Sequence, residues 1–480
     1  MSFSRLTTLH KAPIHSLILP QSIMDRRQFI KYSSLAAAGF TFAACNGNNS
    51  QDQAEIDSAA IDMGEAVDFG PLEKTDLTLG IIPLTDCAPL VIGKEKGFYE
   101  KYGLNVTISK EASWATVRDG LLQGRLDASH ALCGMPMLTE LGPDQAPMRS
   151  LMMLDRNGNA MTLSRNAWEA GIRPMIEYGS FAEFGAEYSK YIKGFSEPPT
   201  FAMVFPSSMH NYNTRYWMSA MDIDPDNDVK LIVIPPPQMV ENMKAGTMDG
   251  YCVGEPWNQR AVFDNVGFTA TVDRDVWKGH PEKVLGTMQE WIDNNPNTAR
   301  ALVAATIEAC QYCDVPENRL EVVEIISRRP YVNANVEYSK ASMTGTYDYG
   351  GFDEEDRVEP IPDFNLFNFI ETDYMERPEN ANYPYTSHGV WLMTQMIRWD
   401  QLPDIKEYPA DADEIIQRIY PTEIYEDVAK AMEIELPSDS MKIEPADVFI
   451  DGREFDPGDP VAYLNGFDIV ANRRRTYSLS

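Results

Sequence analysis

The sequence predicts an α/β protein whose two similar lobes face each other across a cleft. Apolar, β-rich segments alternate with segments of helical periodicity from about residue 77 to residue 132, and the alternation begins again near residue 200. Such alternation is typical of a parallel sheet covered by helices. With 480 residues, 44% of them hydrophobic, the chain is long enough for two units of this kind.

Each unit repeats the order strand, helix, strand, helix, strand. In the first unit we expect strands at 77–84, 104–110 and 126–132 and helices at 88–103 and 114–124. A polar, helix-leaning stretch follows. In the second unit we expect strands at 200–205, 229–235 and 250–254 and helices at 210–221 and 237–246.

The remaining chain departs from this alternation. From Pro281 to about Val315 the pattern is strongly helical. The last third is acidic and rich in Pro, Tyr and Asn, with one clear amphipathic helix at 388–399. We interpret it as an elaboration wrapped around one lobe.

These patterns divide the chain into five parts. They are a leader at 1–44, an acidic tether at 45–75, the first part of lobe I at 76–165, lobe II at 166–284, and a return to lobe I with the acidic elaboration at 285–480. The tether contains many acids and few large apolar side chains, which is typical of a solvated segment.

The leader has the features of an export signal. Arg26 and Arg27 precede a short apolar stretch at 35–44 that ends at Cys45, and Met24 fits as the true start. The stretch is too short to span a bilayer. RRQFIK resembles a twin-arginine signal, and the small residues before Cys45 resemble a lipoprotein processing site. We therefore expect export and a lipid on Cys45; the alternative is an N-terminal helix with a chance cysteine.

Composition and motifs argue against several classes of function. A formal net charge of -31 disfavours nucleic-acid binding through a basic face. The chain has no Walker A loop, no G-x-G-x-x-G after a strand, no H-E-x-x-H and no G-x-S-x-G, so we expect no catalytic residues and no cofactor. No metal-ligand spacing is visible. Cys310 and Cys313 lie in a helical segment and are expected to be buried thiols, with a local disulfide as the alternative.

Two expected helix starts place aromatic donors at the carboxyl end of a strand. Ser113 is a candidate N-cap with Trp114 in the first turn, and Ser207 or Ser208 is a candidate N-cap with His210 nearby. Helix starts present unpaired N–H groups, and open α/β sheets bind ligands at this edge. Two such starts across a cleft predict an anion site; the alternative is that both aromatic residues are structural.

Several motifs together resemble a known family. They are ASWATVRD, VGEPWNQR, WKGHPEKVLG, EACQYCD, NYPYTSHGVWLMTQMIRW and DGREFDPGDPVAYL. In this order they resemble the nitrate/bicarbonate-binding lipoproteins of ABC importers, from about residue 76 to residue 470. The resemblance implies a two-lobed type II periplasmic binding fold. KEKGFYEKYGLNVTI is a broader match, shared with binding proteins for sulfonates and with thiamine-precursor enzymes.

The resemblance also implies four ligand-binding residues. Trp114 matches the tryptophan of the family's S/N-W-[AG] motif, and His210 matches the histidine before its R-Y-W motif. Lys283 matches the last residue of its HPE-x motif. Asn159 matches an amide near the end of the strand that follows the M-P-M segment, although it equally fits a turn.

Lys283 favours nitrate over bicarbonate. Members that resemble nitrate binders carry HPEK, and those that resemble bicarbonate binders carry HPEE. Nitrate offers only acceptors and therefore suits donors and a positive charge, whereas the hydroxyl of bicarbonate suits a carboxylate. The alternative is a surface lysine at a helix start.

The resemblance implies an exported protein that captures nitrate or nitrite and delivers it to the permease and ATPase subunits of an ABC importer. We expect it on the periplasmic side of the inner membrane, held by the lipid on Cys45. The alternatives are a bicarbonate- or sulfonate-binding protein, a cytoplasmic nitrate sensor, and an enzyme of the thiamine-precursor type.

Overall fold

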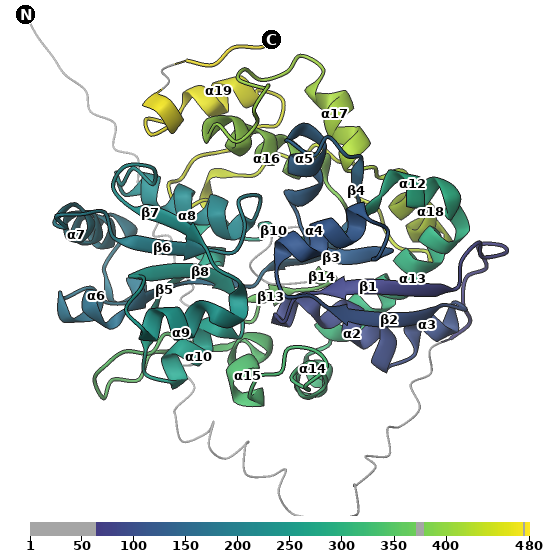
Figure 1. Ribbon diagram of the computed structural model, residues 1–480, viewed down its shortest axis with the longest axis horizontal. Helices are drawn as coiled ribbons and strands as arrows, with labels where there is room; N and C mark the ends of the chain where they lie inside the picture. Colours follow the sequence, from purple (N-terminus) through teal and green to yellow (C-terminus); the bar gives the residue numbers. More distant parts are fainter. Residues whose placement is uncertain (1–63, 371–378, 474–475) are drawn as a thin grey trace, which may run out of the picture. The chain divides into compact units, whose positions relative to one another are not determined.

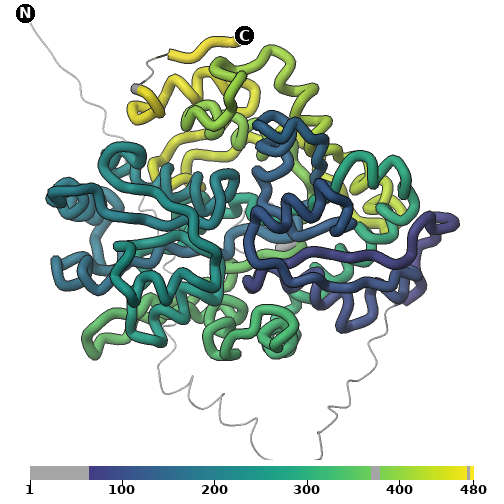
Figure 2. Tube along the Cα trace, viewed as in Figure 1, coloured from purple at the N-terminus to yellow at the C-terminus, as the bar shows by residue number. Residues whose placement is uncertain are grey.

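The computed structural model describes residues 64–370, 379–473 and 476–480. The predicted leader, Cys45 and most of the tether lie outside these residues. Within the described ranges no helix is both long and apolar enough to cross a membrane. The described residues form one unit with two large sheets and two short two-stranded sheets (Figures 1 and 2).

Six strands form the sheet of the first lobe. Their spatial order is β13 (Asn365–Leu366), β4 (Met148–Asn157), β10 (Pro281–Met288), β3 (Ala128–Leu132), β1 (Asp76–Ile81) and β2 (Asn105–Lys110). β1 pairs in parallel with β2 and β3, as the sequence predicts. β10 runs antiparallel to β3 and to β4, so the sheet is mixed and not purely parallel.

Helices with buried apolar faces cover this sheet. They are α2 (Ala88–Glu95), α3 (Phe98–Lys101), α4 (Trp114–Leu122), α5 (Met135–Leu141), α12 (Gln289–Asn294), α13 (Pro296–Asp314) and α14 (Arg319–Ile326). The helix expected at 88–103 is divided into α2 and α3 because Gly97 has a positive φ of 80°. α13 packs on α2 and α3, which places its Cys310 and Cys313 in the core of the first lobe as free thiols.

Five strands form the sheet of the second lobe. Their spatial order is β7 (Lys230–Val233), β6 (Thr200–Met203), β8 (Gly250–Gly254), β5 (Asn159–Ser164) and β9 (Gly267–Val272). β6 pairs in parallel with β7 and β8, whereas β5 runs antiparallel to β8 and β9. The helices of this part are α6 (Arg165–Glu169), α7 (Phe181–Lys193), α8 (Met209–Ala220), α9 (Met239–Lys244), α10 (Trp257–Phe263) and α11 (Asp273–Val276).

The chain passes between the sheets at two hydrogen-bonded crossings. Asn157 and Gly158, with φ of 58° and 94°, carry it from β4 into β5, and the return reaches β10 through Gly279. Gly279 N donates to Asn157 Oδ1 at 2.8 Å. Position 158 requires glycine, because a Cβ there would lie 2.4 Å from Asn365 Nδ2.

The crossings correct two predicted boundaries. β5 belongs to the second sheet, so the chain leaves the first lobe at Gly158 and not after residue 165. β10 belongs to the first sheet, so the return precedes Pro281 and does not follow residue 284. The sequence hides both changes, because β4 and β5 are buried strands separated by a single glycine.

The predicted helical pattern from Pro281 onward is also wrong for its first residues, which form β10. This strand is buried between β3 and β4, and its Val, Leu and Thr side chains suit a buried strand. The helical pattern is correct only for α12 and α13, which are separated at Asn295.

The last third of the chain contacts both lobes and does not wrap around one. Its elements are α15 (Val336–Thr344), β11 (Thr346–Asp348), β12 (Val358–Pro360), β14 (Phe369–Ile370), β15 (Glu379–Asn380), α16 (Thr386–Arg398), α17 (Ala412–Ile419), α18 (Glu423–Ala431) and α19 (Pro460–Asn465). Arg398 Nη2 donates to Ser219 Oγ in the second lobe at 2.8 Å, and Tyr420 Oη donates to Cys133 O in the first at 2.7 Å.

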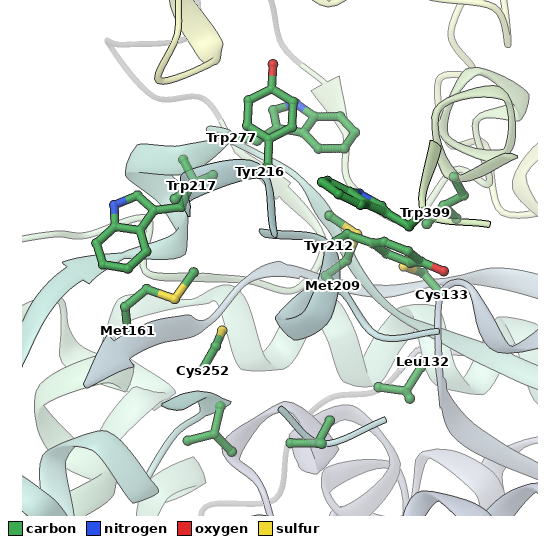
Figure 3. Close-up of a cluster of buried hydrophobic side chains, with 14 of the residues drawn as sticks. Leu132, Cys133, Met161, Met209, Tyr212, Tyr216, Trp217, Cys252, Trp277 and Trp399 are labelled. Atoms are coloured by element: carbon green, nitrogen blue, oxygen red, sulfur yellow. The ribbon is translucent and has the colours of Figure 1, made fainter. Parts of the chain in front are cut away.

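One buried hydrophobic cluster joins the two sheets to these C-terminal elements. Figure 3 shows part of it: Leu132 and Cys133 come from the first lobe, Met161 and Cys252 from the second, and Trp399 from the end of α16. This shared core holds together the ends of strands from both sheets, which is where the candidate site lies.

Candidate ligand-binding site

Two helix starts supply aromatic side chains as the sequence predicts. Ser113 caps α4 by accepting from Thr116 N, and Trp114 is the first helical residue, with a 1% exposed side chain. Ser208 caps α8 by accepting from Asn211 N, and His210 lies in the first turn, fully buried. α4 belongs to the first lobe and α8 to the second.

Lys283 lies in the middle of the first sheet and not at a helix start. Its strand, β10, changes register against β4 on both sides of Lys283, which is the signature of β-bulges. In a regular strand neighbouring side chains point to opposite faces. The bulge instead lets Lys283 Nζ contact the carboxylate of the preceding residue, Glu282.

The ammonium of Lys283 is held by a second carboxylate and lies beside an aromatic ring. Lys283 Nζ is 2.6 Å from Asp86 Oδ2 and 5.5 Å from the centroid of the Trp114 ring. Asp86 belongs to the loop that follows β1, and both side chains are buried. The predicted residues Trp114 and Lys283 are therefore brought together, with Asp86 beside them.

His130 supports this arrangement from β3. Its ring stacks on Trp114 at 5.2 Å, and its Nε2 accepts from Ile82 N at 2.8 Å. Since Nε2 is an acceptor, the proton of the neutral ring is on Nδ1, which lies 3.5 Å from Asp86 Oδ1. Asp86 thus lies between His130 and Lys283, and the contact of its Oδ2 with Lys283 Nζ fixes the position of the ammonium.

Asn159 and His210 approach from the second lobe. His210 Nε2 is 3.6 Å from Glu282 Oε1. Asn159 is the first residue of β5, and a Cβ at Gly254 would lie 3.2 Å from Asn159 Oδ1 and 3.6 Å from Asp86 Oδ2. The four predicted residues therefore converge around Glu282 and Asp86. We call this set of six the junction site: Asp86, Trp114, Asn159, His210, Glu282 and Lys283.

The junction site is rich in buried polar atoms that have no hydrogen-bond partner among the described residues. They are Trp114 Nε1, Asn159 Nδ2 and Oδ1, His210 Nδ1 and Nε2, Asp86 Oδ1 and Glu282 Oε2. A buried polar group without a hydrogen-bond partner lowers the stability of the folded protein by roughly 1–3 kcal/mol. Several such groups in one place therefore indicate a site where a polar ligand supplies the missing hydrogen bonds. Trp114 Nε1, Asn159 Nδ2 and one ring nitrogen of His210 are donors beside one ammonium, and such a group suits a small oxyanion.

Burial and neighbouring charges shift the pKa values of these groups in different directions. Burial acts to lower the pKa of Lys283, but Asp86, Glu282 and Asp155 outweigh it and raise that pKa above its ordinary value. Burial lowers the pKa of His210 far below its ordinary value, and that of His130 to about 4. The lysine is therefore charged, and both histidines are neutral hydrogen-bonding groups.

The acids respond in the opposite way to burial. Burial raises the pKa of Glu282, while Lys283 and the Asn159 side chain act to lower it. Burial and Asp86 raise the pKa of Asp155 well above its ordinary value. Asp155 Oδ1 accepts from the backbone N–H of Lys283 at 2.9 Å, which ties β4 to the bulge in β10. In the described part of the chain no group of three His, Cys, Asp or Glu residues is arranged to hold a metal ion.

Sequence reasoning missed Asp86, Glu282, His130 and Asp155. Asp86 follows the carboxyl end of β1, the same kind of position that singled out Trp114, so the strand-end rule could have found it. Glu282 adjoins Lys283, but ordinary strand alternation would point it to the other face. In so acidic a chain, single carboxylates carry no distinguishing signal.

The chain matches one family model and is similar to known transport proteins. The model of the NMT1-like family matches residues 70–327. The chain is 36% identical to the nitrate/nitrite binding protein NrtA of Nostoc sp. PCC 7120, covering 93% of this chain and 99% of that one. It is 39% identical to the nitrate import ATP-binding protein NrtC of Synechocystis sp. PCC 6803, covering 88% of this chain but only 59% of that one.

A solved structure shows the same fold. The crystal structure of the periplasmic nitrate-binding protein NrtA from Synechocystis PCC 6803 superposes with a TM-score of 0.74 at 34% identity, covering 83% of this chain and all of that one. The predicted two-lobed periplasmic binding fold is therefore confirmed.

Proposed function

The chain belongs to the NMT1-like family, and from this we propose that it is the solute-binding component of an ABC importer that captures nitrate, with nitrite as a second ligand. It delivers the anion to the permease and ATPase subunits of that importer. Its relatives include a nitrate/nitrite binding protein and a nitrate import ATP-binding protein, which supports both the ligand and the partners. The activities named for these relatives do not involve nucleic acid.

This proposal rests on one observation: hydrogen-bond donors from both lobes lie around the ammonium of Lys283. Trp114 Nε1 and Lys283 Nζ come from the first lobe, and His210 and Asn159 Nδ2 come from the second. Nitrate is a planar anion with acceptors on all three oxygens, so it can receive a hydrogen bond from each lobe at once. A ligand that bridges two lobes stabilises their closed arrangement.

The residues of the junction site contribute different interactions to ligand binding. Lys283 supplies the positive charge, and Asp86 holds its ammonium in place. Neutral His210 and Asn159 add donors that need no counter-charge, and burial of the whole set excludes water, which strengthens each interaction. The crossings at Gly158 and Gly279 are the points about which the lobes separate for release.

A thermal-unfolding panel tests the proposal. The purified protein is unfolded with nitrate, nitrite, bicarbonate, taurine or chloride at equal concentration. A ligand present at 100 times its Kd stabilises the native state by about 2.7 kcal/mol. We expect nitrate and nitrite to raise the unfolding temperature and chloride to leave it unchanged. A panel in which only taurine or no anion raises it would contradict the proposal.

Bicarbonate is a second candidate ligand, favoured by one observation. Glu282 Oε2 is a buried acceptor without a partner, and an ionised carboxylate at this place suits the hydroxyl proton of bicarbonate. The ammonium of Lys283 argues against bicarbonate as the ligand, because it already contacts Glu282 Oε1. Stabilisation by bicarbonate but not by nitrate in the same panel would select this candidate.

The proposed location is the periplasmic side of the inner membrane, with a lipid on Cys45 after export by the twin-arginine signal at Arg26 and Arg27. The structural relative is a periplasmic protein, which supports the compartment. Cys45→Ser should move the protein from the membrane fraction to the soluble periplasmic fraction. Membrane association that survives this change would contradict the anchor, and cytoplasmic retention of the unmodified chain would favour a sensor.

A further inference from the structure

Glu282 contacts or neighbours two of the residues that the sequence predicts for the site, Lys283 and His210. Its Oε1 contacts Lys283 Nζ and lies 3.6 Å from His210 Nε2, and Oε2 lies 3.8 Å from His280 Nδ1. Glu282 Oε2 is buried without a hydrogen-bond partner. Lys283 therefore holds Oε1 in place, while Oε2 is a buried oxygen that can take a proton and then donate a hydrogen bond.

The buried charges around this residue do not balance once an anion is present. Lys283 is the cation that contacts Glu282, and it contacts Asp86 as well. If Glu282 were ionised, one ammonium would face two carboxylates and the captured anion in a site shielded from water. An uncompensated buried charge is so costly that a group in such a place takes or loses a proton instead.

We propose that Glu282 contacts the captured oxyanion as a neutral carboxylic acid, so that binding of each anion takes up one proton from solvent. The inference rests on the proposed function and names Glu282 as a residue that determines specificity. The proton goes to Oε2, which then donates its O–H to an oxygen of the ligand. With this proton in place, the ammonium contacts one carboxylate and one neutral acid, so the buried negative charge beside the captured anion is smaller by one.

The surroundings of Glu282 make it the acid that gains this proton. The titratable and charged groups that face it are Asp86 after β1, Cys133 after β3, Asp155 of β4, His210 of α8, Cys252 of β8, Asp273 of α11, and His280 and Lys283 of its own segment. Asp86 is already paired with the ammonium, and Asp155 accepts a backbone N–H. Burial already raises the pKa of Glu282, and a second anion beside it acts in the same direction.

Protonation also gives the site a means to discriminate between ligands. As an acid, Glu282 donates to nitrate, which has only acceptors. As a carboxylate, it would repel nitrate and accept from the hydroxyl of bicarbonate. A proton on Glu282 therefore favours nitrate, and the affinity for nitrate should fall as the pH rises.

Calorimetry measures the proton directly. Nitrate is titrated into the full-length protein at one pH in several buffers that differ in ionisation enthalpy, and the slope of the observed heat gives the protons taken up. We expect a slope of about one proton per nitrate, and a Kd that weakens about tenfold for each pH unit in the range where free Glu282 is ionised. Nitrate binding with a slope of zero would overturn this inference and leave the proposed function intact.

Two matched variants assign the proton. Glu282→Gln keeps an N–H donor at the same place but has no carboxylate to protonate, so nitrate binding to this variant should lose the proton uptake and the pH dependence. Glu255→Gln makes the same change at another buried acid, which accepts from Tyr347 Oη and whose pKa burial raises to about 7. It should retain the slope.

Each result has a distinct meaning. Proton uptake that persists in Glu282→Gln would overturn the assignment to Glu282. If that variant fails to fold, the slope and pH profile of the unmodified protein still decide whether a proton is taken up, and loss of the slope in Glu255→Gln would assign it elsewhere. Absence of any nitrate heat in the unmodified protein would overturn the proposed function together with this inference.

Discussion

The two lobes contribute different chemistry to the junction site. The first lobe supplies its charged side chains, Asp86, Glu282 and Lys283, together with Trp114. The second lobe supplies Asn159 and His210, and burial keeps His210 neutral. The difference indicates that the first lobe selects ligands by their charge. The second lobe adds hydrogen bonds that stabilise the closed arrangement of the lobes.

The largest effect should come from the cation of the first lobe. Lys283→Ala removes a charged hydrogen bond worth about 1.5–3 kcal/mol, so it should weaken nitrate binding roughly 10- to 150-fold. Titration calorimetry of the folded variant measures this loss. Lys193→Ala is the matched control, because Lys193 pairs with Asp222 at an exposed position of the second lobe. Equal nitrate affinity in Lys283→Ala and the unmodified protein would show that this lysine does not bind the ligand.

The same substitution should also destabilise the protein. It leaves Asp86 and Glu282 buried without their cation, and breaking a buried pair costs about 3–5 kcal/mol. Denaturant unfolding measures this cost in the absence of nitrate. Since protonation relieves an unpaired buried carboxylate, the loss should be smaller at acidic pH. A loss that does not depend on pH would point to packing and not to charge.

A smaller effect should come from the neutral donor of the second lobe. His210→Ala removes a hydrogen bond but no charge, so nitrate affinity should fall by about 1–2 kcal/mol, a factor of roughly 5–30. Because the first lobe is unchanged, the proton uptake on binding should remain. Calorimetry of this variant in two buffers tests both statements. Loss of the proton uptake would contradict the proposal that the first lobe supplies the charged groups and the second lobe only neutral donors.

A still smaller effect is expected at Trp114. Trp114→Phe removes the indole N–H and keeps an aromatic ring beside His130 and Lys283, so affinity should fall by about 1 kcal/mol, roughly fivefold. The change in tryptophan fluorescence on adding nitrate should be strongly reduced in this variant. A fluorescence change that is the same in both proteins would show that another tryptophan reports binding.

The smallest effect on binding should come from outside the site. Tyr420→Phe removes the hydrogen bond by which the C-terminal part contacts Cys133 O in the first lobe. The free energy of unfolding should fall by about 1 kcal/mol, while the Kd for nitrate stays within about twofold. Denaturant unfolding and calorimetry of one preparation measure both. A large loss of affinity would mean that this contact helps to hold the lobes closed.

The sequence predicted those parts of the molecule that depend on local pattern. The strands β1, β2, β3, β6 and β8 follow from alternation. The helix start at Trp114 and the place of His210 in the first turn of α8 follow from capping, and the structure confirms them. The motif match supplied Asn159 and Lys283, which the structure places beside the other two. Their role in binding nitrate remains the proposal.

The missed parts depend on contacts between distant segments. The sequence predicts a helix where β10 lies, because its apolar side chains suit either element, and only its place between β3 and β4 decides for a strand. The bulge that turns Glu282 toward Lys283 arises from pairing with β4. The shared core of the C-terminal part with both lobes likewise has no local signal.

One titration shows directly whether the junction site binds nitrate. Nitrate is added to the purified protein in a calorimeter, bicarbonate is added to a second sample, and tryptophan fluorescence is followed in parallel. We expect one nitrate bound per chain, with a fluorescence change from Trp114 and no heat from bicarbonate. Silence toward nitrate, with binding of bicarbonate, would contradict the claim that donors from both lobes and the ammonium of Lys283 form a nitrate site.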